Sequence, residues 1–146
     1  MPGCNLKIIC ALLLAAFLVS ACAGKQGDAA MGEDLKAAFV DKEWVAEYIL
    51  GAPVIDMSHS SIKFQDDGTA TGSGGCNSYS GSYTLEGDVV SFGPMATTMM
   101  MCGGAIDDQE MRFFQSLAAP LTVKIENGML YLSPAEGKSS IFGVQN

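Results

Sequence analysis

Sulfur-containing side chains are the residues of this 146-residue sequence with the widest chemical range. Cys76 and the run Met99-Met100-Met101-Cys102 offer thiolate and thioether groups, the donors that select Cu(I). An extended run would turn only two of the three thioethers to one side, and methionine commonly fills gaps in cores. We therefore expect the three methionines to pack in the core, with no metal site and no cofactor.

The other groups able to do chemistry do not form a recognisable catalytic set. His59 is the only histidine, and a base must lie within hydrogen-bond reach of its nucleophile. Nothing in the sequence places His59 beside Cys76, Cys102 or a serine, and these ligands are too few for zinc. The D-x-x-E spacing of Asp107 and Glu110 is typical of a capping box at a helix start. We assign no catalytic residues and expect a protein that is not an enzyme.

Cys22 is a different kind of site, because it directly follows small residues at the end of an apolar run. Residues 1–21 have one cation, Lys7, then the apolar stretch Ile8–Val19, and they read as a cleaved lipoprotein signal peptide. Twelve apolar positions are too few to span a bilayer, which takes about 20. Cleavage would leave Cys22 as a lipidated N-terminus carrying palmitate-type chains, and two or three such chains anchor a protein stably.

The cellular location of the protein follows from this predicted lipid anchor. The residue after Cys22 is Ala23 rather than aspartate, so under the enterobacterial sorting rule the protein would reach the periplasmic face of the outer membrane. We expect a lipid-anchored protein of the bacterial cell envelope. The alternative is an ordinary cleaved signal in which Cys22 is incidental.

The charge that remains after cleavage limits the classes of partner, and the remaining cysteines indicate a disulfide. Loss of Lys7 leaves seven basic against 16 acidic residues, a net charge of −9. This excess of negative charge argues against nucleic acid as a partner and leaves the lipid as the only membrane contact. Cys76 and Cys102 are then the only cysteines inside the domain. In an oxidising compartment they are disulfide candidates, although spacing alone leaves the bond open.

The arrangement of turns and apolar residues predicts how these groups are positioned. Residues 22–41 are small and polar and read as a lipidated N-terminus with a flexible tether, in which the spacing of Leu35, Ala38 and Phe39 predicts a short helix. Residues 42–146 show about eight short alternating segments separated by Gly, Asn or Pro, and one main helix after residue 105. This pattern predicts an α+β domain with a curled antiparallel sheet, or a partly open barrel, whose helix plugs one end or face.

A cluster of glycines marks the most sharply bent part of this domain. Gly72, Gly74, Gly75 and Gly81 predict bends or close approaches that a Cβ would forbid. Asn77, Ser78, Tyr79 and Tyr83 lie beside them and form a candidate recognition surface. The favoured alternative is that Asn77 occupies a left-handed turn position and that the tyrosines pack the sheet.

The same segment carries a family resemblance. Residues 72–83, the run 94–102, and Glu110 with Phe113 and Leu117 resemble the META/HslJ-like domain family, and the likeness covers about residues 42–144. It implies a compact α+β domain of envelope lipoproteins and secreted proteins, linked in various members to stress response, drug tolerance or motility. The family offers no catalytic residues to carry over. Its cysteine pair corresponds to Cys76 and Cys102, which supports their structural pairing.

Together these features predict a non-enzymatic envelope lipoprotein whose META-like domain binds another protein or an envelope component. One alternative is a carrier that holds a small apolar ligand in the mouth of the curled sheet. The other is an enzyme or redox protein that uses a reactive thiolate at Cys76 or Cys102.

Overall fold

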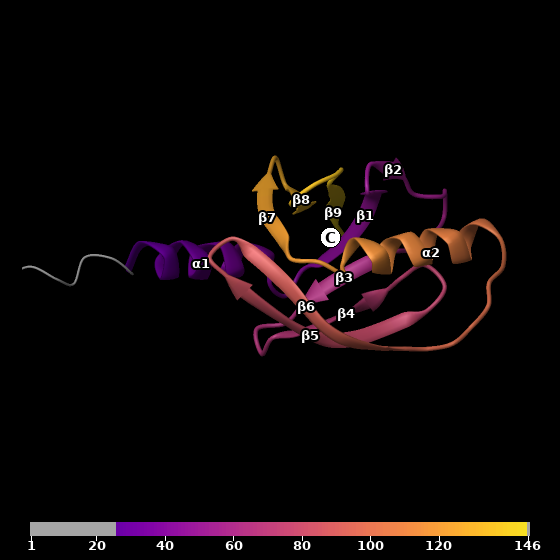
Figure 1. Ribbon diagram of the computed structural model, residues 1–146, viewed down its shortest axis with the longest axis horizontal. Coiled ribbons are helices and arrows are strands. Elements are labelled where there is room, and N and C mark those ends of the chain that lie inside the picture. Colours follow the sequence, from indigo (N-terminus) through magenta and orange to yellow (C-terminus); the bar gives the residue numbers. More distant parts are fainter. Residues whose placement is uncertain (1–25, 146) are drawn as a thin grey trace, which may run out of the picture.

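Two helices and nine strands make up the part of the chain that the computed structural model describes, residues 26–145 (Figure 1). The strands are short and turns separate most of them, as the alternating sequence segments predict. In chain order the elements are α1 (Gln26–Phe39), β1 (Glu43–Ile49), β2 (Ala52–Pro53), β3 (Ser61–Phe64), β4 (Thr69–Ser73), β5 (Ser78–Glu86), β6 (Val89–Thr97), α2 (Ala105–Ser116), β7 (Leu121–Glu126), β8 (Met129–Pro134) and β9 (Ser140–Gln145).

All nine strands belong to one antiparallel sheet in the order β2-β1-β3-β4-β5-β6-β7-β8-β9. β1 also pairs with β9, so the last strand of the chain returns to the first and the sheet curls into a ring. The contact between β6 and β7 is the shortest in this ring, with two residue pairs, Val89↔Thr122 and Val90↔Leu121. The predicted α+β fold with a curled antiparallel sheet and one main helix is therefore confirmed, and the sheet is ring-like rather than a barrel.

Aromatic side chains fill the inside of the ring. Trp44 and Ala46 of β1 are buried while their neighbour Glu47 is exposed, the alternation expected of a strand with one face on the core. The Trp44 indole N–H donates to the carbonyl oxygen of Phe39 at 2.9 Å, which satisfies its polar group inside the core. The fully buried side chains include Phe39, Phe64, Phe113, Phe142, Ile49, Ile62, Leu130 and Leu132.

Helix α1 is part of this core. Phe39, its last residue, is completely buried, and its ring meets that of Phe64 edge-on with centroids 4.7 Å apart. Val40 then bridges to β3. The predicted helical spacing is thus confirmed, whereas the prediction of a flexible tether over residues 22–41 is wrong for residues 26–39, because an aromatic residue at the end of that segment is buried against β3. The predicted signal peptide, Cys22 and residues 23–25 lie outside the described residues.

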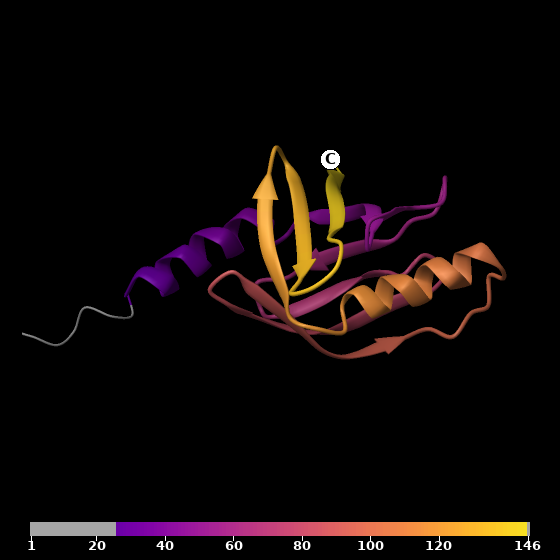
Figure 2. The same cartoon turned by 45° about the horizontal axis from the view of Figure 1, so that its top comes forward.

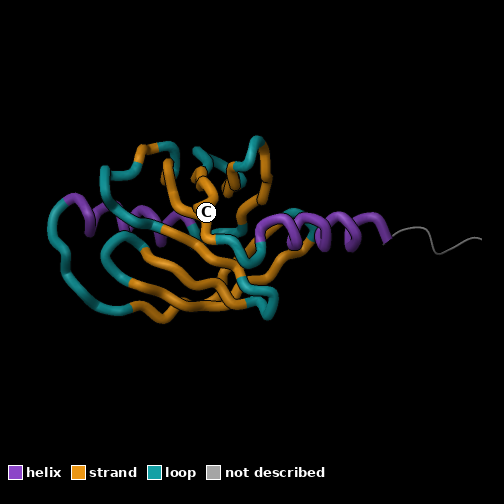
Figure 3. Tube along the Cα trace, turned by 180° about the vertical axis from the view of Figure 1, so that it is seen from behind, coloured by secondary structure: helices purple, strands orange, loops and turns teal. Residues whose placement is uncertain are grey.

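Figures 2 and 3 place the two helices toward opposite ends of the long axis. α1 projects at one end, and the loop 98–104, which joins β6 to α2, turns at the other. Among residues 26–145, neither helix has the length and the apolar character that a bilayer crossing requires.

Candidate functional site

Asn77 lies at the centre of a hydrogen-bond network beneath the loop 98–104. Its side-chain oxygen accepts hydrogen bonds from the Met100 backbone N–H at 2.6 Å and from the Thr98 hydroxyl at 2.8 Å. Its side-chain amide donates to the Met100 carbonyl at 3.1 Å and to Glu110 Oε2 at 2.7 Å. Both polar atoms of this buried side chain are therefore hydrogen-bonded, and together they join the turn before β5 to the loop and to α2. We call Asn77, Thr98, Met100 and Glu110 the Asn77 network.

The Glu110 carboxylate joins α2 to the turn before β5. Its Oε1 accepts from the backbone N–H of Asn77 at 2.6 Å and from that of Cys76 at 3.2 Å. Gly74 makes the approach possible, since a Cβ there would lie 2.6 Å from Oε1. The predicted close approach at the glycine cluster is thus confirmed at this position.

The capping box predicted from Asp107 and Glu110 is wrong. The N-cap of α2 is Gly104, which makes no side-chain cap. Asp107 instead accepts from the backbone N–H groups of Cys102 and Gly103, each at 3.1 Å, while Glu110 serves the strand side of the network. The two carboxylates are close in the sequence but bind different partners: Asp107 binds the loop before α2, and Glu110 binds the turn before β5.

A disulfide joins Cys76 to Cys102, with the Cα atoms 5.9 Å apart. It ties the end of the loop 98–104 to the turn before β5, next to the Asn77 network. Neither sulfur is a free thiolate while the bond is intact, so the pair holds the structure and offers no nucleophile in this state.

Three of the four residues of the predicted recognition surface are buried. Tyr79 is 4% exposed and donates from its hydroxyl to the Ser61 carbonyl at 3.0 Å, and burial raises the pKa of Tyr79. Tyr83 donates to the Gln65 carbonyl at 2.8 Å, and burial also raises the pKa of Tyr83. Only Ser78 is exposed. The structure therefore corrects the surface interpretation: Asn77, Tyr79 and Tyr83 serve the interior and present little surface to a partner.

The alternative prediction, that the tyrosines pack the sheet and that Asn77 occupies a left-handed turn position, is right about the tyrosines and wrong about Asn77. Tyr79 packs edge-on against Phe114, with ring centroids 5.5 Å apart. Asn77 is not among the described residues with a positive φ. Its role comes from side-chain hydrogen bonds rather than from a left-handed backbone.

The expectation that Met99, Met100 and Met101 pack in the core is wrong. Their exposed fractions are 95%, 58% and 92%. The expectation assumed an extended strand, but β6 ends at Thr97 and the methionines belong to the loop 98–104. The Asn77 network binds the backbone of this loop, and its side chains therefore point outward.

His59 makes a hydrogen bond with Glu43 at the surface. Its Nε2 lies 3.0 Å from Glu43 Oε1, and both side chains are about half exposed. The hydrogen bond to His59 lowers the pKa of Glu43. The only histidine of the chain thus has a carboxylate partner, and among residues 26–145 no three His, Cys, Asp or Glu side chains gather as a metal site.

A surface cleft lies between α1 and the turn that joins β3 to β4. Its larger hollow, of about 430 Å³, is lined by Glu33, Lys36, Ala37, Val40, Asp41 and Asp66. An adjoining hollow of about 250 Å³ shares Lys36 and Asp66 and continues to Asp67 and Tyr83. We call these two hollows the α1 cleft. Four carboxylates line it against one ammonium group, so its net charge is negative.

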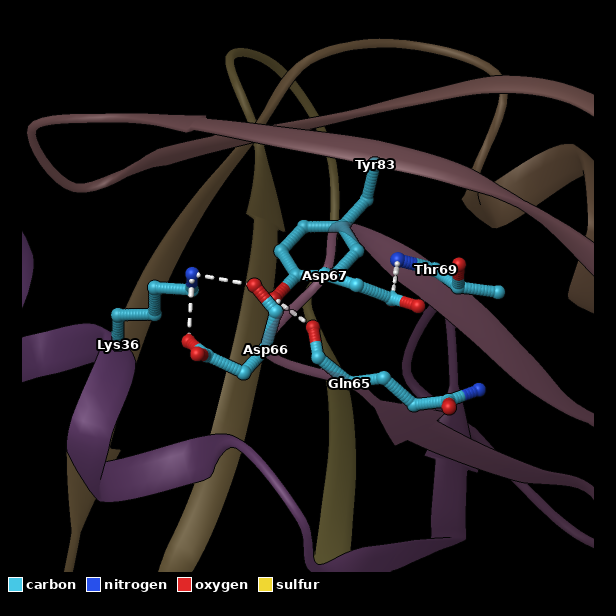
Figure 4. A network of polar contacts seen from close by, with 6 residues as sticks. All are labelled: Lys36, Gln65, Asp66, Asp67, Thr69 and Tyr83. Carbon is cyan, nitrogen blue, oxygen red and sulfur yellow. Dashed lines mark hydrogen bonds and ion pairs between the residues drawn. The ribbon is translucent and has the colours of Figure 1, made fainter.

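Hydrogen bonds fix one wall of the α1 cleft, as Figure 4 shows. The Lys36 ammonium lies 2.8 Å from both the carbonyl oxygen and a carboxylate oxygen of Asp66, and this contact raises the pKa of Lys36. The Asp67 carboxylate accepts from the Thr69 N–H at 2.9 Å, which holds the turn. Lys36 is thus already engaged, while Glu33 and Asp41 are exposed.

Sequence reasoning missed the α1 cleft because residues 26–39 were assigned to a tether. The spacing of Leu35, Ala38 and Phe39 was the signal that could have found it. A helix with that apolar face must dock on the sheet, and its polar residues Glu33 and Lys36 then border the nearest turn.

Solved structures similar to this chain agree with the fold. An NMR structure of a protein from Burkholderia xenovorans has a TM-score of 0.61 at 22% identity and covers 87% of this chain and 94% of its own. Another NMR structure has a TM-score of 0.58 at 24% identity, covering 70% and 88%. The crystal structure of a DUF4847 family protein from Bacteroides vulgatus has a TM-score of 0.52 at 18% identity, covering 77% and 97%. At such identities the likeness shows the fold alone.

No curated protein matches the chain. The sequence profile of the META domain matches residues 35–146, a range that begins inside α1 and includes both cysteines of the disulfide. The resemblance found in the sequence is thereby confirmed, and the chain belongs to the META domain family.

Proposed function

We propose that this protein is a non-enzymatic binding module, held at the bacterial cell envelope by a lipid on Cys22, that binds a cationic segment of another protein or envelope component in the α1 cleft. The α1 cleft is the observation that carries the proposal. It combines a hollow of about 430 Å³ with exposed carboxylates at Glu33 and Asp41. Such a surface attracts lysine and arginine side chains and repels acidic ones.

The anchor supports this assignment through its place in the sequence. α1 begins at Gln26, four residues after Cys22. Four residues span at most about 14 Å when fully extended, so a lipid at Cys22 would keep the start of α1 near the bilayer. The α1 cleft, lined by the second half of α1, would then lie within the combined reach of the linker and the helix, about 35 Å from the bilayer, where a partner attached to the envelope can reach it.

The chemistry of the described residues supports binding over catalysis. Cys76 and Cys102 are bonded to each other, His59 pairs with Glu43, and the hydroxyls of Tyr79 and Tyr83 donate to backbone carbonyls. The disulfide leaves neither cysteine as a thiolate nucleophile, and backbone carbonyls hold the two tyrosine hydroxyls inside the domain.

The apolar carrier gains no support from the interior of the ring. Large side chains, Trp44, Phe64 and Phe142 among them, fill it, and charged residues make up half of the lining of the two hollows of the α1 cleft. An apolar ligand would meet carboxylates there, which is unfavourable for its binding.

Binding of basic peptides to the full mature chain tests the cleft. A lysine- and arginine-rich peptide should shift the amide resonances of residues 33–41 and 66–68, whereas a glutamate-rich peptide of the same length should not. The variant Glu33→Gln/Asp41→Asn keeps the Lys36–Asp66 pair and should weaken binding about three- to tenfold, and added salt should weaken it further.

The matched control is Asp56→Asn/Glu136→Gln, which removes two exposed carboxylates that do not line the cleft. Equal loss of binding in both variants would mean that net charge alone attracts the peptide, and the α1 cleft would lose its role.

Incorporation of labelled palmitate tests the anchor separately. The wild-type chain expressed in a bacterium should take up the label and sediment with membranes, and Cys22→Ala should do neither. A wild-type protein recovered without label from the soluble fraction would overturn the anchoring.

A further inference from the structure

We propose that Met99 and Met101 of the loop 98–104, together with Met111 on α2, bind a soft monovalent metal ion, Cu(I) or its analogue Ag(I). The first support is exposure. Met99, Met101 and Met111 are 95%, 92% and 69% exposed, and Met100 is 58% exposed. Apolar side chains held in water contribute little to the core, so folding leaves these four thioethers free to act as ligands.

The backbone of the loop is fixed on both sides of the methionines. Asn77 binds the N–H and the carbonyl of Met100, and the Thr98 N–H donates to the Ser78 carbonyl at 3.0 Å. Beyond the methionines, Cys102 is bonded to Cys76 and its N–H is held by Asp107. The thioethers therefore extend from a preorganised support, and a ligand would order only their side chains on binding.

The chain geometry allows the thioethers to converge. The Cα atoms of Met99 and Met101 are two residues apart and so lie within about 7 Å of each other, a gap that two flexible methionine side chains can close around one ion. Met111 follows Asp107 by four residues, which places it on the same face of α2. Asp107 itself binds the loop at Cys102 and Gly103, directly after Met101, so this face of α2 starts where the methionine run ends.

The ligand type decides which metal fits. Thioethers are soft, neutral donors that select Cu(I) over Zn²⁺, Mg²⁺ or Ca²⁺. Within residues 26–145 the harder donors do not gather into a competing site, and the two cysteines are consumed by their disulfide. The carboxylates of Asp107 and Asp108 lie in the first turn of α2, directly after the loop, and their negative charge favours a cation over an anion there.

Silver titration of the full chain with its disulfide intact tests the proposal directly. Ag(I) nitrate in a chloride-free buffer serves as the redox-inert probe, and ¹³C-labelled methionine methyl resonances are the readout. The resonances of Met99, Met101 and Met111 should shift and saturate together at about one equivalent per chain, because one ion shares them. Those of the partly buried Met95 and Met129 should stay in place.

Cu(I) affinity is then measured by competition with a chromogenic Cu(I) chelator. Met99→Leu/Met101→Leu should weaken binding about tenfold or more, since leucine keeps the size of the side chain and removes the donor. Met57→Leu is the matched control, because Met57 is fully exposed on the loop between β2 and β3.

Both variants should keep the wild-type far-ultraviolet spectrum, since the substituted side chains are exposed. The proposal is overturned if the Met57 resonance shifts in parallel with the others without saturation, because the thioethers would then bind silver independently. It is also overturned if the double variant competes for Cu(I) as well as the wild type, or if the methionines are merely oxidised to sulfoxides in the presence of copper without retaining the metal.

Discussion

Glu110 shows how one side chain can join elements that lie far apart in the sequence. Its carboxylate accepts three hydrogen bonds from Cys76 and Asn77, more than 30 residues earlier in the chain. In Glu110→Gln, the side-chain NH₂ would face N–H groups of Cys76 and Asn77, and at least one of these partly buried donors would lose its acceptor. We expect the free energy of unfolding to fall by about 1–3 kcal/mol.

Urea unfolding measures this loss. Asp108→Asn, an exposed position on the same helix, should change stability by less than about 0.5 kcal/mol. If Glu110→Gln behaved like Asp108→Asn, the Asn77 network would not depend on the carboxylate.

Tyr79 gives the protein a pH dependence in the alkaline range. Burial raises the pKa of Tyr79 above the value of about 10 that an unfolded tyrosine has. Below that pH both states hold the proton, so Tyr79 contributes no pH dependence to the free energy of unfolding. Above it the unfolded chain ionises while the folded chain stays neutral, so stability falls as pH rises.

Tyr79→Phe should cost about 1 kcal/mol at neutral pH, because the Ser61 carbonyl loses its donor, and it should flatten the decline between about pH 9 and pH 11. Urea midpoints measured across this range check both effects. An unchanged alkaline slope would show that Tyr79 ionises freely in the folded state.

At the level of elements, the sequence predicted the strands and turns better than the ends of the domain. Turns such as Asn127-Gly128 carry their own signal, since Asn127 and Gly128 both adopt a positive φ between β7 and β8. The Asn77 network carries no such signal, because it joins the ends of the paired strands β5 and β6 to Glu110 on α2, which only the folded structure brings beside them. The prediction for Met99–Met101 is wrong for a related reason. These residues would be buried in a strand, but they lie in a loop that is held by its backbone, and their side chains are exposed.

Helix α1 tests where the domain begins. Phe39 is completely buried against Phe64, so Phe39→Ala should lower the free energy of unfolding by about 3–5 kcal/mol. If Phe39 belonged to a flexible tether, the same substitution would change the free energy of unfolding very little. Ala37, exposed on the same helix, supplies the control variant Ala37→Ser, and thermal or urea unfolding distinguishes the two.

The disulfide stabilises the loop 98–104 from its far end. Cys76→Ser/Cys102→Ser opens a ring with a sequence separation of 26 and should cost about 3.5 kcal/mol in the chain-entropy description. The Asn77 network does not include the sulfur atoms, so the loop should keep its place in the folded variant. Urea unfolding gives the cost, and an unchanged midpoint would show that the bond constrains little of the unfolded chain.

For the whole molecule, the long axis separates two surfaces of different chemistry. The acidic α1 cleft is lined by the second half of α1 and the β3–β4 turn, whereas the loop 98–104 with its methionines lies at the end of the long axis opposite to the start of α1 (Figure 1). With a lipid on Cys22, the start of α1 would face the bilayer and the loop 98–104 would face away from it. One domain could then meet a membrane-bound partner and a diffusing ion on separate faces.

This orientation can be measured on the lipidated chain bound to vesicles that contain a paramagnetic lipid. Gln26 is at most about 14 Å along the chain from Cys22, so resonances at the start of α1 should broaden more than those of residues 99–103. Non-lipidated protein from Cys22→Ala, mixed with the same vesicles, supplies the baseline. Broadening that is stronger at the methionine loop than at α1 would mean that the domain folds back onto the membrane. The methionine loop would then face the bilayer, and the long axis would not hold the two surfaces on opposite sides.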